Sequence, residues 1–259
     1  MRVPFSRPSS PGKQHVERMR IIHLDETDST NRYLRDYRCD DEEMVVATTD
    51  YQTAGRGQGI HTWESEPGKN LLFSVLIHPK GVAAAEQFIL SEVGALALKK
   101  VLDDYTDDIT LKWPNDVYWH DRKLSGTLIE TAVSAAGLKR CIYGVGLNVN
   151  QQVFHSDAPN PVSMWQILGR ELDRERLLHE LLNVLQQFLS RLYHGERDAF
   201  REAYHLALYR REGYHPYSDV SGRFMAVIDH VEDDGHLILR DIHGCQRSYA
   251  FGELQFIQQ

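Results

Sequence analysis

A glycine-rich loop carries residue types that suit the binding of an anion. Gly55, Gly57 and Gly59 stand at alternate positions, and Arg56 lies between the first two. Glycines let the backbone approach a ligand closely, and successive free N–H groups form a nest for an anion. Arg56 adds a permanently charged planar fork that fits a phosphate or a carboxylate. Trp63 is placed to shield a bound molecule, although a flexible surface loop is an alternative interpretation of the same pattern.

A second group of polar residues surrounds a proline turn in the segment LKWPNDVYWHDRKLSGTLIE. Lys112, Asn115 and Asp116 flank the turn, and Lys123 stands at the start of an apolar strand. Taken singly, Asn115 and Asp116 are ordinary turn residues and Lys123 is a solvated strand end. Next to a glycine nest contributed by another segment, Lys123 could instead neutralise an anionic transition state.

A third pattern places two glycines and an amide in an apolar strand, YGVGLNVN. Gly144 and Gly146 permit close approach of a ligand or of another chain segment. Asn148 alternates with apolar neighbours, and a buried amide must have hydrogen-bond partners. A structural hydrogen bond and a contact to a ligand both remain open for Asn148.

The elements around the glycine-rich loop are predicted from apolar runs. Strands are expected at residues 20–24, 44–49 and 70–77, and N-cap residues at 28–31 predict a helix over roughly Thr30–Tyr37. The connection between the second and third strands is about twenty residues long, well beyond the roughly 4–6 residues of an ordinary loop. Such a loop is a binding loop or lid, or else it is disordered.

Helical periodicity marks the middle of the chain. Apolar residues recur at helical spacing from Phe88 to Val101, and a further helix is expected near Asp198–Leu208. The runs KLSGTLIETAV and KRCIYGVGLNVN are rich in β-formers and are separated by the turn SAAG. The clearest helix lies in the segment 171–193, where one apolar stripe is typical of core packing. This stripe consists of Leu177, Leu178, Leu181, Leu182, Leu185, Phe188, Leu189 and Leu192.

The chain changes character at about Gly213. Three short strands follow, joined by turns at Asp234-Gly235 and His243-Gly244. The order of elements therefore predicts a mixed α+β core followed by a small antiparallel β unit.

Composition excludes several classes of protein. The chain has 259 residues, 42% of them hydrophobic, and a formal net charge of −8, so a globular core is expected and an extended basic face for nucleic acid is not. No apolar run approaches the roughly 20 residues of a membrane span. The three cysteines are far apart, without a CxxC pair, which favours neither a disulfide framework nor a zinc site and indicates a cytoplasmic location.

Together, the motifs resemble those of the biotin–protein ligase family. The resemblance rests on the ordered set STN, YQTAGRG followed by W, KWPND followed by RKLSGTLIE, and GVGLNVN, and it covers roughly Ile21–Phe256. It implies an α+β fold with a mixed β-sheet catalytic core flanked by helices and a small C-terminal SH3-like β-barrel, which the ending YAFGEL fits. The expected domains are a disordered tail at 1–19, a catalytic domain at 20–212 and the SH3-like domain at 213–259.

The resemblance also implies a reaction and its partners. The carboxylate of biotin would attack the α-phosphorus of ATP to give biotinoyl-5′-AMP, and a lysine of a biotin carboxyl carrier protein would then take up biotin. Mg²⁺ would accompany ATP, and the enzyme would be a monomer or a homodimer. Some family members carry an N-terminal DNA-binding domain. Because only about twenty residues precede the first motif, a monofunctional enzyme that binds neither DNA nor membrane is expected.

Functional roles follow from the resemblance residue by residue. The catalytic residues would be Lys123, which bridges the biotin carboxylate and the α-phosphate, together with Arg56 and Asp116. Biotin would be bound by Ser29, Thr30, Asn31, Gln52, Arg56, Gly57, Gln58 and Lys123. ATP would be bound by Arg56, Trp63, Lys112, Asn115 and Asn148. No side chain is assigned as a metal ligand.

One position departs from the family pattern. Many members have a second basic residue where this chain has Gln58, and a neutral amide adds no charge to hold the adenylate. Two other functions fit parts of the pattern. A lipoate–protein ligase shares the fold and the adenylate chemistry, and a non-catalytic protein that binds biotin or a nucleotide would need neither Arg56 nor Lys123.

Overall fold

The computed structural model describes residues 18–39, 43–57, 59, 62–134, 137–155 and 160–257. In chain order the elements are β1 (Arg18–Thr27), α1 (Thr30–Arg35), β2 (Glu43–Gln52), β3 (Leu71–Ile77), the 3-10 turn η1 (Ala84–Glu86), α2 (Phe88–Leu102), β4 (Ile109–Lys112), β5 (Asp116–Trp119), β6 (Arg122–Ser134), β7 (Gly137–Leu147), α3 (Met164–Leu168), α4 (Arg174–Tyr193), α5 (Arg197–Ala207), β8 (His215–Asp219), β9 (Gly222–Val231), β10 (Leu237–Asp241), β11 (Gln246–Tyr249) and β12 (Gln255–Phe256).

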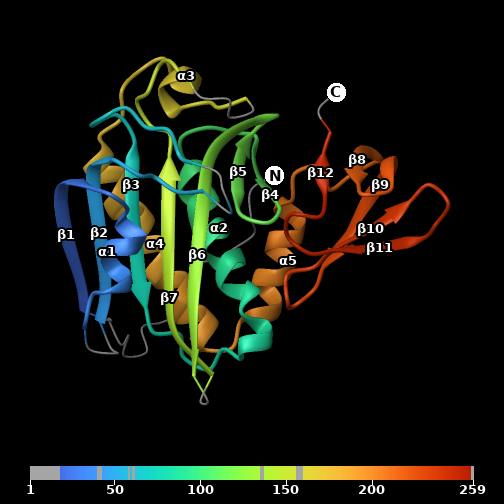
Figure 1. The fold of residues 1–259 in the computed structure, drawn as a ribbon, viewed down its shortest axis with the longest axis horizontal. Helices are drawn as coiled ribbons and strands as arrows, with labels where there is room; N and C mark the ends of the chain where they lie inside the picture. Colours follow the sequence, from blue (N-terminus) through green and yellow to red (C-terminus); the bar gives the residue numbers. More distant parts are fainter. Residues whose placement is uncertain are drawn as a thin grey trace.

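A seven-stranded mixed sheet forms the larger part of the molecule (Figure 1), in the order β1-β2-β3-β7-β6-β5-β4. β1 and β2 are parallel and are connected through α1, whereas the other neighbours are antiparallel. β1 begins at Arg18, opposite Glu43 of β2. The sheet therefore includes the last two residues of the predicted tail, and residues 1–17 lie outside the described part of the chain.

The central strands are apolar along their whole length because both faces of the sheet are covered. In β2, Val45 and Ala47 pack under Leu34 of α1, while Met44 and Val46 join the large core beneath α2 and α4. Every residue of β3 is buried. Figure 1 shows α1 on one face of the sheet and α2 and α4 on the other.

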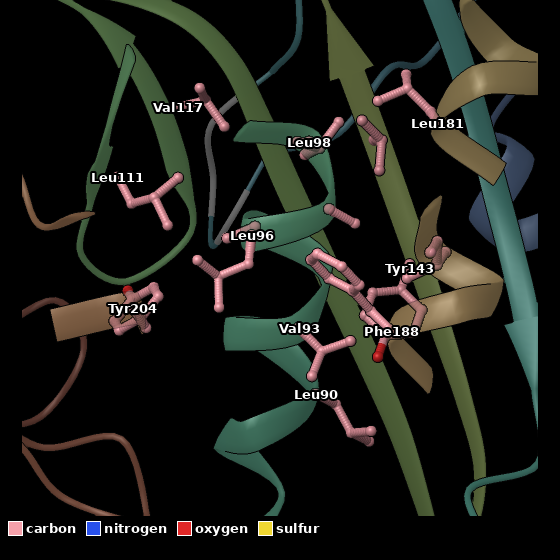
Figure 2. Packing of buried hydrophobic residues seen from close by; sticks show 14 of the residues in the cluster. Leu90, Val93, Leu96, Leu98, Leu111, Val117, Tyr143, Leu181, Phe188 and Tyr204 are labelled. Atoms are coloured by element: carbon pink, nitrogen blue, oxygen red, sulfur yellow. The ribbon is translucent and has the colours of Figure 1, made fainter. Parts of the chain in front are cut away.

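α2 lies at the centre of the larger core (Figure 2). It packs between Leu111 and Tyr204 on one side and Tyr143 and Phe188 on the other. Leu96 of α2 is fully buried among these side chains, and its replacement by alanine would cost about 2–5 kcal/mol of stability.

α4 confirms the predicted apolar stripe, because its eight buried residues are the eight predicted ones. The helix begins after Asp173, whose side chain accepts a hydrogen bond from the backbone N–H of Arg176. The short helix α3 was not predicted. It has only five residues, too few for periodicity, although Ser163 and Gln166 form a capping box at its start. Among the described helices, none combines the length and apolar character that crossing a membrane requires.

The C-terminal unit is a five-stranded antiparallel sheet in the order β11-β10-β9-β8-β12. The three predicted strands are β9, β10 and β11, and the turns between them lie where the sequence indicated. β8 and the two-residue β12 complete the sheet and were not predicted. The α+β class with a mixed core and a small C-terminal β unit is thus confirmed. Figure 1 shows α5 between the two sheets.

Candidate active site

A cavity of about 730 Å³ lies where the main sheet meets the C-terminal segment. Residues from all three predicted motif groups line it, and so do residues that were not predicted from the sequence. Its lining comprises Ser29, Thr30, Asn31, Gln52, Arg56, Gly57, Thr62, Trp63, Lys112, Trp113, Pro114, Asn115, Asp116, Tyr118, Lys123, Gly126, Thr127, Leu128, Gly144, Val145, Gly146, Phe251, Gly252, Leu254, Gln255, Phe256 and Ile257.

One end of the cavity is lined by hydroxyl and amide groups. The parallel pairing of β1 with β2 sets Thr27 opposite Gln52, which brings the start of α1 next to the end of β2. There the backbone N–H of Thr30 donates to Gln52 Oε1 at 2.9 Å. Ser29 and Thr30 are buried and line the cavity, so this part of the cavity wall is largely desolvated.

Glycines form the floor of the cavity. Gly126 and Gly146 are cross-strand partners, and the indole of Trp63 lies over them. A Cβ atom at Gly146 would sit 2.4 Å from Trp63 Cε2, and one at Gly144 would sit 2.1 Å from Asn31 Oδ1. The absence of side chains at Gly144 and Gly146 therefore leaves room for Asn31 and Trp63, which also line the cavity.

The other end of the cavity is charged. Lys123 Nζ lies 2.7 Å from Asp116 Oδ1 and 5.7 Å from the centre of the Trp63 ring. The backbone of Lys123 is fixed on both sides, since its N–H donates to Asn160 O at 2.8 Å and its carbonyl accepts from Val162 N at 2.9 Å. Its ammonium group is held between an aromatic face and a carboxylate.

A second lysine joins the main sheet to the C-terminal segment. Lys112 Nζ donates to Tyr118 OH at 3.1 Å and lies 5.1 Å from the ring centre of Phe256 in β12. Burial lowers the pKa of Lys112, an effect that the charge of Asp116 opposes. The segment 251–257 also lines the cavity, which was not predicted from the sequence. The ending YAFGEL was recognised only as part of the C-terminal unit, and no local pattern indicated that it lines a cavity.

The proline turn between β4 and β5 is held by hydrogen bonds to β6. Asn115 Nδ2 donates to the carbonyl of Thr127, and Thr127 N donates back to the carbonyl of Asn115 at 3.0 Å. On the other side, Trp113 Nε1 donates to the carbonyl of Gly235, in the turn between β9 and β10, at 2.9 Å. The turn that carries Asn115 and Asp116 is therefore fixed by both parts of the molecule.

The glycine-rich loop folds back on itself beside the cavity. Arg56 and Thr62 form an antiparallel bridge, and Trp63 N donates to the carbonyl of Gly55 at 3.1 Å. Arg56 is exposed and Gly57 half-buried, and both line the cavity. Gln58 lies outside the described residues.

Asn148 is the one described candidate that does not line the cavity. It is buried, and its Nδ2 donates to the carbonyl of Val162 at 3.1 Å. Because Val162 pairs with the backbone of Lys123, Asn148 supports the segment that holds this lysine. Its Oδ1 has no partner among the described residues.

Comparisons with known proteins identify the family of the chain. A model of the Biotin/lipoate A/B protein ligase family matches residues 24–148. The biotin--[acetyl-CoA-carboxylase] ligase of Paracoccus denitrificans is 31% identical over 205 residues, which are 75% of this chain and 83% of that protein. The chain belongs to the biotin–protein ligase family.

Longer and structurally characterised relatives match as well. The bifunctional ligase/repressor BirA of Salmonella typhimurium is 32% identical over 195 residues, or 73% of this chain, but the match spans only 54% of BirA. The chain thus spans about half the length of that family member. The biotin protein ligase from Aquifex aeolicus, solved in complex with biotin and ATP, superposes with a TM-score of 0.76 at 26% identity, covering 93% of this chain and 99% of that one.

Proposed function

We propose that this chain is an ATP-dependent ligase that forms biotinoyl-5′-AMP and transfers biotin to a lysine of a biotin carboxyl carrier protein. The observation that carries the proposal is one cavity that joins the hydroxyl and amide groups of Ser29, Thr30 and Gln52 to the lysines Lys112 and Lys123. Biotin has the same division, since its ureido ring is neutral and its carboxylate is an anion. Names of relatives support the assignment, because both the Paracoccus protein and the Aquifex protein are biotin ligases.

Biotin would lie along the sheet with its ring at the end lined by hydroxyl and amide groups. Ser29, Thr30 and Gln52 supply hydroxyl and amide groups for the ureido ring, and Asn31 stands directly behind them. The carboxylate would then extend towards Lys123. Arg56 and Gly57 belong to the loop that would close over the ligand, which would keep water away from a reactive acyl phosphate.

The first half-reaction brings two anions together. A carboxylate oxygen of biotin forms a bond to the α-phosphorus of ATP, and the bond from this phosphorus to the bridging oxygen breaks, so pyrophosphate leaves. Repulsion opposes this approach unless positive charge is fixed at the meeting point. Lys123 is suited to this task because Trp63 and Asp116 hold its ammonium group in place before substrates bind. Arg56 would add a second positive charge.

In the second half-reaction, the ε-amine of a carrier lysine attacks the acyl carbon of the adenylate. The acyl–oxygen bond breaks, AMP leaves, and the nitrogen gives up a proton. Asp116 is the one carboxylate among the cavity-lining residues, which makes it the group to orient the amine and accept that proton. Lys123, 2.7 Å away, would offset the charge of the departing phosphate.

ATP would occupy the end of the cavity between the proline turn and the C-terminal segment. Lys112 and Asn115 would face the nucleotide, Trp63 would cover it, and Asn148 would act through the segment that holds Lys123. Mg²⁺ typically uses one or two carboxylates together with substrate phosphates, and Asp116 alone fits that pattern here. The ion would neutralise part of the negative charge of the phosphates and would be held mainly by ATP.

The experiment separates binding from the two chemical steps. The chain is incubated with ATP, Mg²⁺, biotin and a carrier domain, and the carrier is examined by mass spectrometry for the added biotin. Lys123→Ala should slow pyrophosphate release by roughly 10²–10³-fold, as expected for the loss of one preorganised electrostatic contact. Biotin binding, measured by calorimetry, should change much less.

Lys100→Ala is the matched control, because Lys100 is partly exposed and pairs with Asp104 on the surface. It should leave both steps unchanged. Pyrophosphate release at a near-normal rate in Lys123→Ala would exclude the role given to this lysine. Modification of the carrier by lipoate and not by biotin would exclude the proposed substrate.

A further inference from the structure

Two amide side chains, those of Asn70 and Gln151, are fully buried at the end of the glycine-rich loop. Asn70 directly precedes β3, and Gln151 follows β7 by a few residues. Asn70 Nδ2 donates to Gln151 Oε1 at 2.6 Å. Neither residue lines the cavity. Because a buried amide is costly unless its polar groups are paired, the partners of these two side chains show what they hold in place.

The side chain of Gln151 uses its whole hydrogen-bonding capacity. Its Oε1 accepts from the backbone N–H of Glu66 at 3.1 Å as well as from Asn70. Its Nε2 donates to Glu64 Oε1 at 3.2 Å and to the carbonyl of Val153 at 2.9 Å. A side-chain amide has two donors and two acceptor lone pairs, so all four are used. The backbone N–H of Glu66 can only donate, which fixes the orientation of this amide.

The side chain of Asn70 is oriented in the same way. Its Oδ1 accepts from the backbone N–H of Val149 at 3.0 Å. Its Nδ2 therefore faces Gln151 and also Ser65 Oγ, which lies 3.2 Å away. Residues 64–70, which we call the loop stem, are thus anchored by two buried amides to the segment that follows β7.

The segment after β7 is also bonded to the strand of Lys123. The backbone N–H of Asn148 donates to the carbonyl of Leu124 at 3.0 Å, directly after Lys123 in the chain. The next backbone N–H, that of Val149, donates to the side chain of Asn70. Two successive residues therefore join the strand of Lys123 on one side to the loop stem on the other.

Trp63 directly precedes the loop stem, and the centre of its ring lies 5.7 Å from Lys123 Nζ. The indole N–H is buried and has no hydrogen-bond partner among the described residues. The ring is therefore held by its packing over Gly126 and Gly146 and by the placement of its own backbone. On the C-terminal side, that placement depends on Glu64 and the rest of the loop stem.

We propose that Gln151 and Asn70 are positioning residues for adenylate formation, which keep the Trp63 ring against the ammonium group of Lys123 by anchoring the loop stem. The inference rests on the proposed function, in which Lys123 lies between the biotin carboxylate and the α-phosphate. Stabilisation by a fixed charge requires that the charge be in place before the substrates meet. A misplacement of about 1 Å can cost about 10²-fold in rate, although neither amide needs to touch a substrate.

Two substitutions weaken the anchor. Gln151→Met removes all four hydrogen bonds and keeps an unbranched side chain of similar length. With saturating ATP and biotin, it should slow pyrophosphate release at least about tenfold. The calorimetric Kd for biotin should stay within about twofold, because the groups assigned to the ureido ring lie at the other end of the cavity.

Glu64→Ala is the milder variant, because Glu64 is only half-buried. It removes one bond of the anchor and should slow pyrophosphate release about threefold, the scale of one net hydrogen bond. Urea unfolding shows which variants are folded at the assay temperature. If Gln151→Met is unfolded there, Glu64→Ala carries the test.

Asn150 offers the matched control. It is a buried amide next to Gln151, but its side chain bonds to the backbone of Leu172, with both distances at 2.9 Å. Its backbone N–H, which donates to the carbonyl of Lys69 in the loop stem, is retained in Asn150→Leu. This variant should be less stable than wild type but should release pyrophosphate within about twofold of the wild-type rate. Equal slowing in Asn150→Leu and Gln151→Met would overturn the proposal.

A double substitution tests whether the effect passes through Trp63. In a Trp63→Leu background, Gln151→Met should slow pyrophosphate release by no more than about a further twofold. An equal tenfold loss in both backgrounds would overturn the proposal, as would normal release in both Gln151→Met and Glu64→Ala.

Hydrogen exchange gives a readout that does not depend on the reaction. The backbone amides of residues 64–70 should exchange faster in Gln151→Met than in Asn150→Leu, and equal exchange in the two variants would exclude the anchoring. If the wild-type chain releases no pyrophosphate from ATP and biotin, the proposed function fails, and the exchange result still decides whether the two amides anchor the loop stem.

Discussion

Glu92 is a buried carboxyl group where the main domain, through α2 and α5, meets the C-terminal β unit. It lies on α2, is only 4% exposed, and its Oε2 has no hydrogen-bond partner among the described residues. Burial raises its pKa from 4.5 to about 8; the charge of Arg201 lowers this value, and that of Asp233 in the C-terminal sheet raises it further. Arg201 and Asp233 form an ion pair at 2.8 Å across the joint.

The raised pKa predicts how stability depends on pH. The folded state holds the proton of Glu92 more tightly than the unfolded state does, so this contribution is fully present below pH 4.5 and is lost as pH rises towards about 8. Between these values each pH unit corresponds to about 1.4 kcal/mol. The side chain of Glu92→Gln is neutral throughout. Between roughly pH 5 and pH 7, the free energy of unfolding of this variant should therefore rise by about 3 kcal/mol relative to that of wild type.

The measurement is urea unfolding of both proteins by tryptophan fluorescence at several pH values from 5 to 8. The test is how the difference between the two free energies of unfolding changes with pH, because all other titrating groups are common to the two proteins. Glu202→Gln controls for the replacement of an exposed glutamate on α5. A difference that stays constant across this range would refute a buried, protonated Glu92.

Three further substitutions test how the site is built. Gly146→Ala places a methyl group within 2.4 Å of the Trp63 indole and should reduce the rate of pyrophosphate release at least tenfold, about 1.4 kcal/mol. Trp113→Phe removes the N–H that holds the carbonyl of Gly235 and should lower kcat for carrier modification while the Kd for biotin stays unchanged. Gly235→Ala combines a positive φ of 96° with a Cβ position only 2.7 Å from Phe88 Cδ2. Gly244→Ala is the control, because φ is also positive there but no atom lies within 4 Å of the added Cβ. The melting temperature of Gly235→Ala should therefore fall further than that of Gly244→Ala.

The sequence by itself determined the features that depend on local periodicity and local turn chemistry. The stripe of α4 was predicted residue by residue because burial of one helix face is encoded at a fixed spacing. The strands around the glycine-rich loop followed from apolar runs, and the turns at Asp234-Gly235 and His243-Gly244 from short-range backbone preferences. The motifs were also local strings, which is why the family resemblance appeared before any fold was known.

The tertiary structure alone decided which of these sequence motifs lie next to one another and which groups each side chain contacts. Asn31 bonds to Glu130 across 99 positions of sequence, and Trp113 bonds to Gly235 across 122. No periodicity carries such information, because the pairing depends on strand order and on the parallel crossover through α1. For the same reason no local pattern indicated that the Asn148 side chain donates to the carbonyl of Val162 or that the segment 251–257 lines the cavity. Contacts between residues so far apart in the sequence depend on how the strands are arranged, so only the folded chain specifies them.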